Sequence, residues 1–129
     1  MSIFFSDEAI AKLIQEDVPY LDLTTFALEI GHQPGEIAFF TRHPMTVCAT
    51  EEAAKVFHHC GATVNYQVAS GTFLAEKQLI LQATGHAQGL HIAWRVALNL
   101  MEYTSGIASR TRELVEAAKS VNPAVAVVT

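Results

Sequence analysis

The chain has 129 residues, of which 50% are hydrophobic and only 16% are charged. This composition excludes a disordered chain, because the apolar side chains can offset the entropy that is lost on ordering. No stretch of about 18 apolar residues is free of charges, which excludes a membrane span. The net charge is −5, and no basic stripe is present, which excludes a nucleic-acid-binding surface.

Helical and strand patterns alternate through the first half of the chain. Ser6 followed by two acids predicts a capped amphipathic helix over residues 6–16. The β-rich segments 24–30 and 36–42 flank a turn at 31–35 and predict a hairpin.

A second set of elements follows Pro44. Residues 45–49 predict a short strand, and Thr50 is the expected cap of a helix that stops at Gly61. Alternation over 62–69 predicts a half-buried strand, with Val64, Tyr66 and Val68 on one face. Residues 72–84 supply one or two further short strands.

The pattern changes to helical spacing after Gly85. It predicts two helices, at 86–103 and 105–119, the second with Ile107, Leu114 and Ala118 on its inner side. Residues 124–128 are typical of a strand buried on both faces of a parallel sheet. A helix that leads into such a strand is half of an α/β unit, so we expect the chain to be a fragment that ends at the first strand of a second domain. The mean hydropathy of +0.25 also predicts an apolar surface that a partner covers.

Four groups of residues are candidates for chemistry. The first contains the carboxylates Glu16, Asp17 and Asp22, followed by Thr24 and Thr25. Paired carboxylates can serve acid–base or Mg²⁺ chemistry. The alternative interpretation, which we favour, is a set of helix-end and turn acids.

The second group is His58-His59-Cys60. Adjacent helical residues point about 100° apart, which does not suit a shared metal ion. We therefore interpret the two histidines as surface residues at a helix C-terminus. Cys48 and Cys60 have no metal-ligand spacing, so we expect free thiols in a reducing compartment.

The third group is the pair Gly85 and Gly89 on either side of His86. Their spacing matches no phosphate-binding loop, and tight turning into the following helix explains them better.

The fourth is Arg95, which lies within an apolar helical segment. A guanidinium at such a position needs an acid or an anionic ligand. An internal ion pair with Glu102 and a functional anion contact are both consistent with the pattern.

Two blocks of sequence carry a resemblance to a known family. Glu16-Asp17, then Asp22-Leu23-Thr24-Thr25, is similar to a Glu-Asp … Gly-Asp-x-Thr-Thr or Ser opening. Arg95-Val-Ala-Leu-Asn99, then Tyr103-Thr-Ser-Gly-Ile-Ala108 and Thr111, is similar to Glu-Arg-x-Ala-Leu-Asn-Phe … Ser-Gly-Ile-Ala-Thr. Both patterns belong to quinolinate phosphoribosyltransferases, the carboxylating nicotinate-nucleotide pyrophosphorylases. The resemblance covers nearly the whole chain.

The resemblance implies an α+β fold, with a hammerhead-type antiparallel sheet and flanking helices over residues 1–105. Residues 106–129 would be a helix and the first strand of an incomplete α/β barrel. That barrel would hold Mg²⁺ and phosphoribosyl pyrophosphate, so no catalytic residue and no metal site are expected here. The family also implies a cytoplasmic homodimer, in which Arg95 reaches into the partner's pocket and binds a carboxylate of an acidic pyridine-type substrate.

Three positions depart from the family pattern. Trp94 replaces the Glu before the Arg, Leu21 replaces a Gly, and Leu100 replaces a Phe. These departures resemble the pyrophosphorylase-like subgroup of molybdenum-transport operons. Two alternatives therefore stay open beside the transferase: an accessory protein of molybdenum transport with a different substrate, and a non-catalytic assembly domain that pairs Arg95 internally with Glu102 or Glu113.

Overall fold

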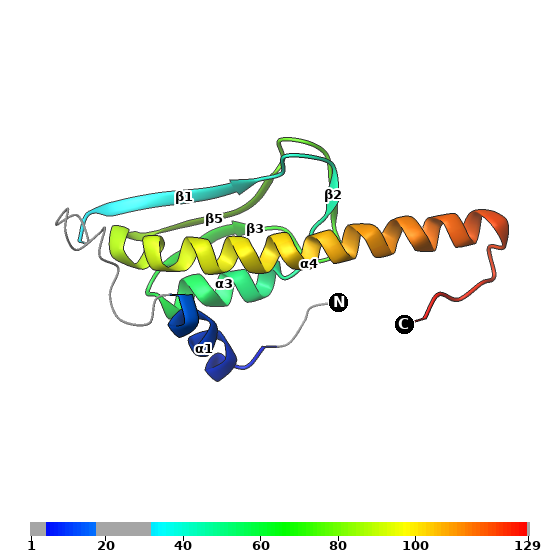
Figure 1. The fold of residues 1–129 in the computed structure, drawn as a ribbon. Coiled ribbons are helices and arrows are strands. Elements are labelled where there is room, and N and C mark those ends of the chain that lie inside the picture. The colour runs from blue at the N-terminus through cyan, green and yellow to red at the C-terminus, as the bar shows by residue number, and fades with distance from the viewer. Residues whose placement is uncertain (1–4, 18–31, 129) are drawn as a thin grey trace.

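The computed structural model describes residues 5–17 and 32–128, and places an antiparallel sheet on one side of a helical layer (Figure 1). The order of elements is α1 (Asp7–Asp17), β1 (Pro34–Phe40), β2 (Met45–Thr46), α3 (Thr50–His59), β3 (Thr63–Gln67), β4 (Phe73–Leu74), β5 (Leu79–His86) and α4 (Ala87–Val121). The predicted α+β class with a hammerhead-type sheet is confirmed. The predicted strand at 24–30 lies outside the described residues.

The main sheet has the strand order β1-β5-β3, and both pairings are antiparallel. A separate ribbon pairs β2 with β4. The middle strand, β5, carries Leu81 and Ala83, which are fully buried. Helices α3 and α4 lie beneath the sheet, and α1 packs below α3 (Figure 1). The core fills the space between these layers and includes Ile10, Phe39, Val47, Val56, Phe57, Leu81, Leu90, Val96 and Met101.

Helix α1 begins as the sequence predicts. The Ala9 amide donates to the Ser6 hydroxyl at 3.1 Å, and Asp7 and Glu8 occupy the first turn. The predicted cap of α3 is wrong. Its N-cap is Ala49, in the left-handed region at φ 59°, and the Thr50 hydroxyl instead donates to the Glu51 carboxylate. The N-cap position thus has no side-chain capping bond.

The predicted face of β3 is wrong at Tyr66, whereas Val64 and Val68 pack against the core as predicted. Val64 pairs with Ala83 and Tyr66 with Gln82, so Asn65 is an extra residue in the ladder. A bulge of this kind reverses the alternation of side chains. Tyr66 therefore lies 45% exposed, whereas the pattern predicted it beside Val64.

The two helices predicted after Gly85 are a single helix. α4 runs without interruption from Ala87 to Val121, through Ser105 and Gly106. An isolated glycine costs a helix only about 1 kcal/mol relative to alanine, and the Thr104 hydroxyl donates to the Leu100 carbonyl inside the helix. The predicted boundary at 105/106 falls inside this helix, and the division into two domains stays a prediction.

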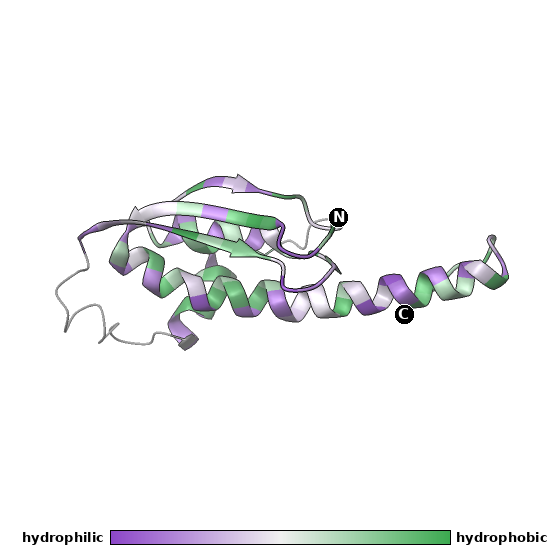
Figure 2. Ribbon diagram, turned by 90° about the horizontal axis from the view of Figure 1, so that it is seen from above, coloured by the Kyte–Doolittle hydropathy of each residue, from purple (hydrophilic) through white to green (hydrophobic). Residues whose placement is uncertain are grey.

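The second half of α4 extends away from the sheet, as Figures 1 and 2 show. Ile107 is 54% exposed and Leu114 61% exposed, so their predicted inward orientation is wrong. The strand predicted at 124–128 is also wrong. After a turn at Asn122, residues 125–128 form no strand, because no strand of the described residues lies beside them. Exposed apolar side chains along this half of α4 are those of Tyr103, Ile107, Leu114 and Val121.

One buried acid in α3 sets a pH dependence. Glu52 is 2% exposed, and its Oε2 has no hydrogen-bond partner among the described residues. Burial raises the pKa of Glu52 above its ordinary value of 4.5, and the nearby Glu51 adds to the rise. The folded chain thus binds this proton more tightly than the unfolded chain does.

We expect Glu52→Gln to flatten the pH dependence of stability. Protonation of Glu52 in the folded state contributes to the free energy of unfolding. This contribution is fully present below pH 4.5 and is lost as the pH rises through the raised folded-state pKa. Glu52→Met, of similar shape without a charge, should raise the free energy of unfolding at pH 7 by about 1–3 kcal/mol. Urea unfolding between pH 4 and 8 measures both effects. The exposed Glu113→Gln serves as the control, and an equal change in that variant would contradict the assignment to Glu52.

Candidate functional site

Arg95 projects from the half of α4 that packs under the sheet. Ala93, Val96 and Ala97 beside it are buried, while Arg95 itself is exposed. Successive residues of a helix point about 100° apart, so a side chain between core residues can leave the core on its own flank. The sequence pattern placed Arg95 in an apolar segment, and the structure places its charge outside that core.

Arg95 has no acidic partner among the residues that the structure describes. The ion pair found there joins Arg112 to Glu116 at 3.0 Å, and neither Glu102 nor Glu113 pairs with Arg95. The Arg95 guanidinium carbon lies 5.6 Å from the centroid of the Trp94 ring, within the range of a cation–π contact. The planar face of the guanidinium is thus supported, and its N–H groups are available to an anion.

The other candidate groups have structural explanations. Glu16 and Asp17 are the last residues of α1, while Asp22, Thr24 and Thr25 lie outside the described residues. His58 and His59 are exposed at the end of α3, as predicted. Within residues 5–17 and 32–128, no three His, Cys, Asp or Glu side chains gather as a metal site would require.

Both cysteines are free thiols, as the sequence predicted. They are half-buried, and burial raises the pKa of Cys60 to about 11. At neutral pH the Cys60 thiol therefore stays protonated, which makes it a poor nucleophile and a poor metal ligand.

Gly85 and Gly89 are sites of close packing, and the interpretation as turn glycines is wrong. Neither has a positive φ. A Cβ on Gly85 would lie 3.1 Å from Cα of Ala62, and a Cβ on Gly89 would lie 2.4 Å from the carbonyl oxygen of Cys60. The two glycines let β5 and the first turn of α4 approach the end of α3.

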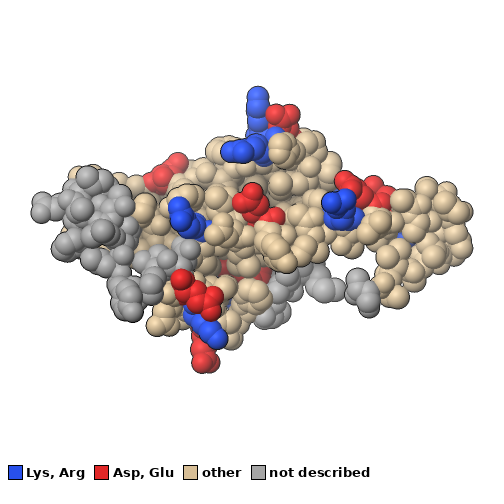
Figure 3. Space-filling model, viewed as in Figure 1, with Lys and Arg blue, Asp and Glu red and all other residues tan. Residues whose placement is uncertain are grey.

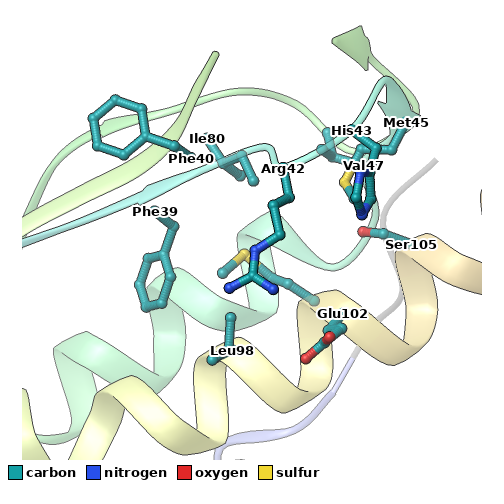
Figure 4. A pocket seen from close by; sticks show the side chains of 11 residues that line it. Phe39, Phe40, Arg42, His43, Met45, Val47, Ile80, Leu98, Glu102 and Ser105 are labelled. Atoms are coloured by element: carbon teal, nitrogen blue, oxygen red, sulfur yellow. The ribbon is translucent and has the colours of Figure 1, made fainter. Parts of the chain in front are cut away.

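The sequence did not single out a pocket between α4 and the loop that joins β1 to β2 (Figure 4). The pocket has a volume of about 370 Å³. Arg42 and His43 come from the loop, and Glu102 and Ser105 come from the helix. The pair of basic residues before Pro44 was the only local signal, because Arg42 and Glu102 are 60 residues apart in sequence.

Two serines of α4 attach the chain after this loop to the helix. The Thr46 amide donates to the Ser109 hydroxyl at 3.0 Å, and the Cys48 amide donates to the Ser105 hydroxyl at 2.9 Å. Serines four residues apart lie on one face of a helix, and here they accept from alternate amides of an extended segment. These bonds give acceptors to two backbone amides, those of Thr46 and Cys48, at the point where the chain passes along α4.

We expect Ser105→Ala to lower the free energy of unfolding by about 1–3 kcal/mol, because the Cys48 amide would lose its acceptor in a buried position. Ser105 is 2% exposed, so water cannot replace the hydroxyl without rearrangement. The exposed Ser120→Ala on the same helix should stay within about 0.5 kcal/mol of the parent. Guanidinium unfolding of the two variants measures the difference, and equal stabilities would show that the serine bond contributes nothing.

Residues 22–105 match the family model described as the quinolinate phosphoribosyl transferase N-terminal domain. The chain belongs to this family. Its resemblance at Arg95-Val-Ala-Leu-Asn99 lies within the matched part, while Ile107, Ala108 and Thr111 of the second motif follow it.

The chain is 41% identical over 121 residues to the ModD protein of Rhodobacter capsulatus, covering 94% of this chain and 47% of that protein. It is 29% identical over 106 residues to the human carboxylating nicotinate-nucleotide pyrophosphorylase, covering 82% of this chain and 35% of that protein. The chain thus spans less than half the length of these relatives.

Solved structures carry the same fold. NadC from Streptococcus pyogenes superposes with a TM-score of 0.80 at 27% identity, over 90% of this chain and 44% of that chain. The nicotinate-nucleotide pyrophosphorylase from Ehrlichia chaffeensis gives a TM-score of 0.79 at 27% identity, over 90% of this chain and 43% of that chain. The described helices and sheet are therefore the fold of the quinolinate phosphoribosyl transferase N-terminal domain.

No described helix combines the length and apolar character needed to cross a membrane. On the face seen in Figure 3, acidic and basic side chains lie in small groups separated by uncharged surface. The sequence also predicted an apolar surface that another subunit or domain covers. The exposed apolar side chains of α4 are the part of the structure that fits this prediction.

Proposed function

We propose that this chain is the N-terminal part of a phosphoribosyltransferase of the carboxylating nicotinate-nucleotide pyrophosphorylase type, a cytoplasmic pentosyltransferase of NAD biosynthesis. The observation that carries the proposal is the exposed Arg95, which has no acidic partner in the described part of the chain and lies in a motif of the family. A free guanidinium on a rigid helix is suited to bind a planar carboxylate with two parallel hydrogen bonds. Arg95 is then a substrate-binding residue.

Arg95 acts on the substrate pocket of a second subunit in this proposal. The chain spans less than half of its relatives, so the remaining length would form the barrel that holds the reacting groups. Tyr103 and Ile107 are exposed next to the Arg95 half of α4, and burial of such side chains favours association. A homodimer in which each N-terminal domain covers the partner's barrel would supply Arg95 from outside the barrel.

The reaction proposed joins a pyridine-type ring nitrogen to C1 of phosphoribosyl pyrophosphate. The bond from C1 to the pyrophosphate oxygen breaks, and its electron pair leaves with pyrophosphate. For quinolinate, loss of carbon dioxide follows. The described residues do not fit a Mg²⁺ site, because no cluster of hard oxygen ligands forms there. We assign Mg²⁺ to the barrel, and Arg95 orients the acidic substrate without taking part in the bond changes.

A second candidate is an accessory protein of molybdenum transport with the same fold and another substrate. The higher identity to the Rhodobacter capsulatus ModD protein than to the human enzyme favours this candidate. Trp94 and Leu100, which replace the usual residues on either side of the Arg95 motif, also favour it. A changed neighbour of the carboxylate-binding arginine is where a change of substrate would be expected.

Release of pyrophosphate by the full-length protein tests the proposal. If the first proposal holds, the protein should convert quinolinate and phosphoribosyl pyrophosphate, in the presence of Mg²⁺, to a mononucleotide and pyrophosphate. A panel of other pyridine and pyrimidine carboxylates, tested in parallel, covers a changed substrate. Turnover of one of these and not of quinolinate would move the assignment to the second candidate. No turnover of any compound by a folded dimer would favour an assembly role.

A further inference from the structure

The pocket beside the β1–β2 loop holds two opposite charges that do not meet. Arg42 reaches down from the loop, with its guanidinium above Leu98 and Glu102 of α4 (Figure 4). Arg42 and Glu102 form no ion pair, and neither has a hydrogen bond among the described residues. Each charge therefore faces the pocket without a protein partner.

The floor of this pocket is apolar. It is made by core and near-core side chains, namely Phe39, Met45, Val47, Ile80, Leu98 and Met101. A volume of about 370 Å³ is within the range of small-molecule sites, which combine an apolar lining with a few convergent polar groups. The pocket is large enough for one small aromatic or aliphatic compound.

The loop that carries Arg42 is held at its first end. The Thr41 side chain is 3% exposed, donates to the Ala75 carbonyl and accepts from the Gln78 amide. The Thr41 amide donates to the Gln78 carbonyl, and its own carbonyl accepts from the Lys77 amide. Thr41 therefore fixes the backbone immediately before Arg42.

The other end of the loop is bound to α4 through Ser105 and Ser109, as described above. With both ends bonded, the loop backbone is fixed, and it holds the Cα atoms of Arg42 and His43 beside the pocket before any ligand arrives. Pre-organised charges bind more tightly, because less conformational freedom is lost on binding.

We propose that this pocket binds a compact zwitterion, with its carboxylate on Arg42, its cationic nitrogen on Glu102 and its apolar body on the floor. A ligand with a single negative charge would leave Glu102 unpaired beside it, and a single positive charge would leave Arg42 unpaired. Only a ligand that carries both charges satisfies both sides. The site is separate from the role of Arg95 and does not depend on the proposed transferase activity.

Three compounds of matched shape test the proposal on the 129-residue chain at pH 7. They are L-phenylalanine, 3-phenylpropionate and 2-phenylethylamine, which carry both charges, the carboxylate alone and the ammonium alone. In ¹⁵N-resolved NMR titrations, L-phenylalanine should bind at least tenfold more tightly than either single-charge compound. Its largest shifts should fall on residues 39–47 and 98–105.

Two variants separate the contributions of the charges. Arg42→Gln should weaken the binding of L-phenylalanine and of 3-phenylpropionate by about tenfold or more. Glu102→Gln should weaken the binding of L-phenylalanine and of 2-phenylethylamine, but not the binding of 3-phenylpropionate. Arg110→Gln and Glu113→Gln, exposed charges of α4 that do not line the pocket, should change none of the three. All four positions are exposed, so the folded spectrum should persist in each variant.

Equal affinities for the three compounds would overturn the proposal, as would the absence of saturable shifts at these residues. Tighter binding of L-phenylalanine by Glu102→Gln would overturn it as well. That result would show that Glu102 only competes with ligands for Arg42.

Discussion

Gly89→Ala should destabilise the chain by about 2–4 kcal/mol. The added Cβ would lie 2.4 Å from the carbonyl oxygen of Cys60, a separation that van der Waals repulsion forbids. The carbonyl belongs to the backbone at the end of α3, so no side chain can rotate to relieve the clash. Either α4 moves away from α3 or the end of α3 unwinds, and both loosen the core. Thermal unfolding should show a midpoint lower by roughly 10 °C.

Gly106→Ala in the same helix is the matched control. A Cβ at Gly106 would meet no atom within 4 Å, and alanine favours a helix over glycine by about 1 kcal/mol. This variant should therefore be more stable than the parent. If Gly89→Ala kept full stability while Gly106→Ala gained it, the close approach of α4 to Cys60 would not exist in solution.

The secondary structure could be predicted where local pattern and tertiary packing agree. Ser6 caps α1 and Thr63–Gln67 forms a strand, because the local signals there meet no competing contact. The prediction failed at Ser105, which was expected to be the first residue of a second helix and lies inside α4. In the structure the Ser105 hydroxyl accepts from the Cys48 amide. A contact across 57 residues of sequence cannot be seen in a local pattern.

The face of β3 shows the same limit. Strict alternation over 62–69 predicted one buried face, but the extra residue at Asn65 reverses it for Tyr66. A bulge depends on the register of the neighbouring strand, which the sequence of one strand does not contain.

The candidate site could be predicted in part. Arg95 is conspicuous because a charge in an apolar helical segment demands an explanation, and the structure shows that no internal acid of the described residues supplies one. Arg42 and Glu102 gave weaker signals, since Arg42 is one of two basic residues before Pro44 and Glu102 was considered only as an internal partner of Arg95. Only the packing of the β1–β2 loop against α4 brings them to one pocket.

The proposed role of Arg95 gives the second large effect. In the full-length dimer, Arg95→Ala should raise KM for the acidic substrate about ten- to a hundredfold and leave the KM of phosphoribosyl pyrophosphate nearly unchanged. Loss of one charge-assisted contact to a carboxylate costs about 1.5–3 kcal/mol, which corresponds to this range. Arg95→Lys should restore only part of the affinity, because an ammonium cannot form two parallel hydrogen bonds with a carboxylate. Steady-state kinetics with each substrate varied in turn measures the change.

The stability of the Arg95→Ala chain should match the parent, because the exposed guanidinium has no ion pair with the described residues and lies only at the edge of the core, over the Trp94 ring, and surface substitutions change stability by about 0.5 kcal/mol or less. Arg110→Ala, another exposed arginine of α4, controls for the general loss of positive charge.

Subunit mixing then tests whether Arg95 acts across the dimer. Each mixed dimer of an Arg95→Ala chain and a chain with an inactivated barrel should have about half of the parent dimer's activity, because one of its two sites combines an intact barrel with the partner's Arg95. Recovery of no activity on mixing would place Arg95 in its own subunit's pocket, and an unchanged KM in Arg95→Ala would remove it from the substrate site altogether.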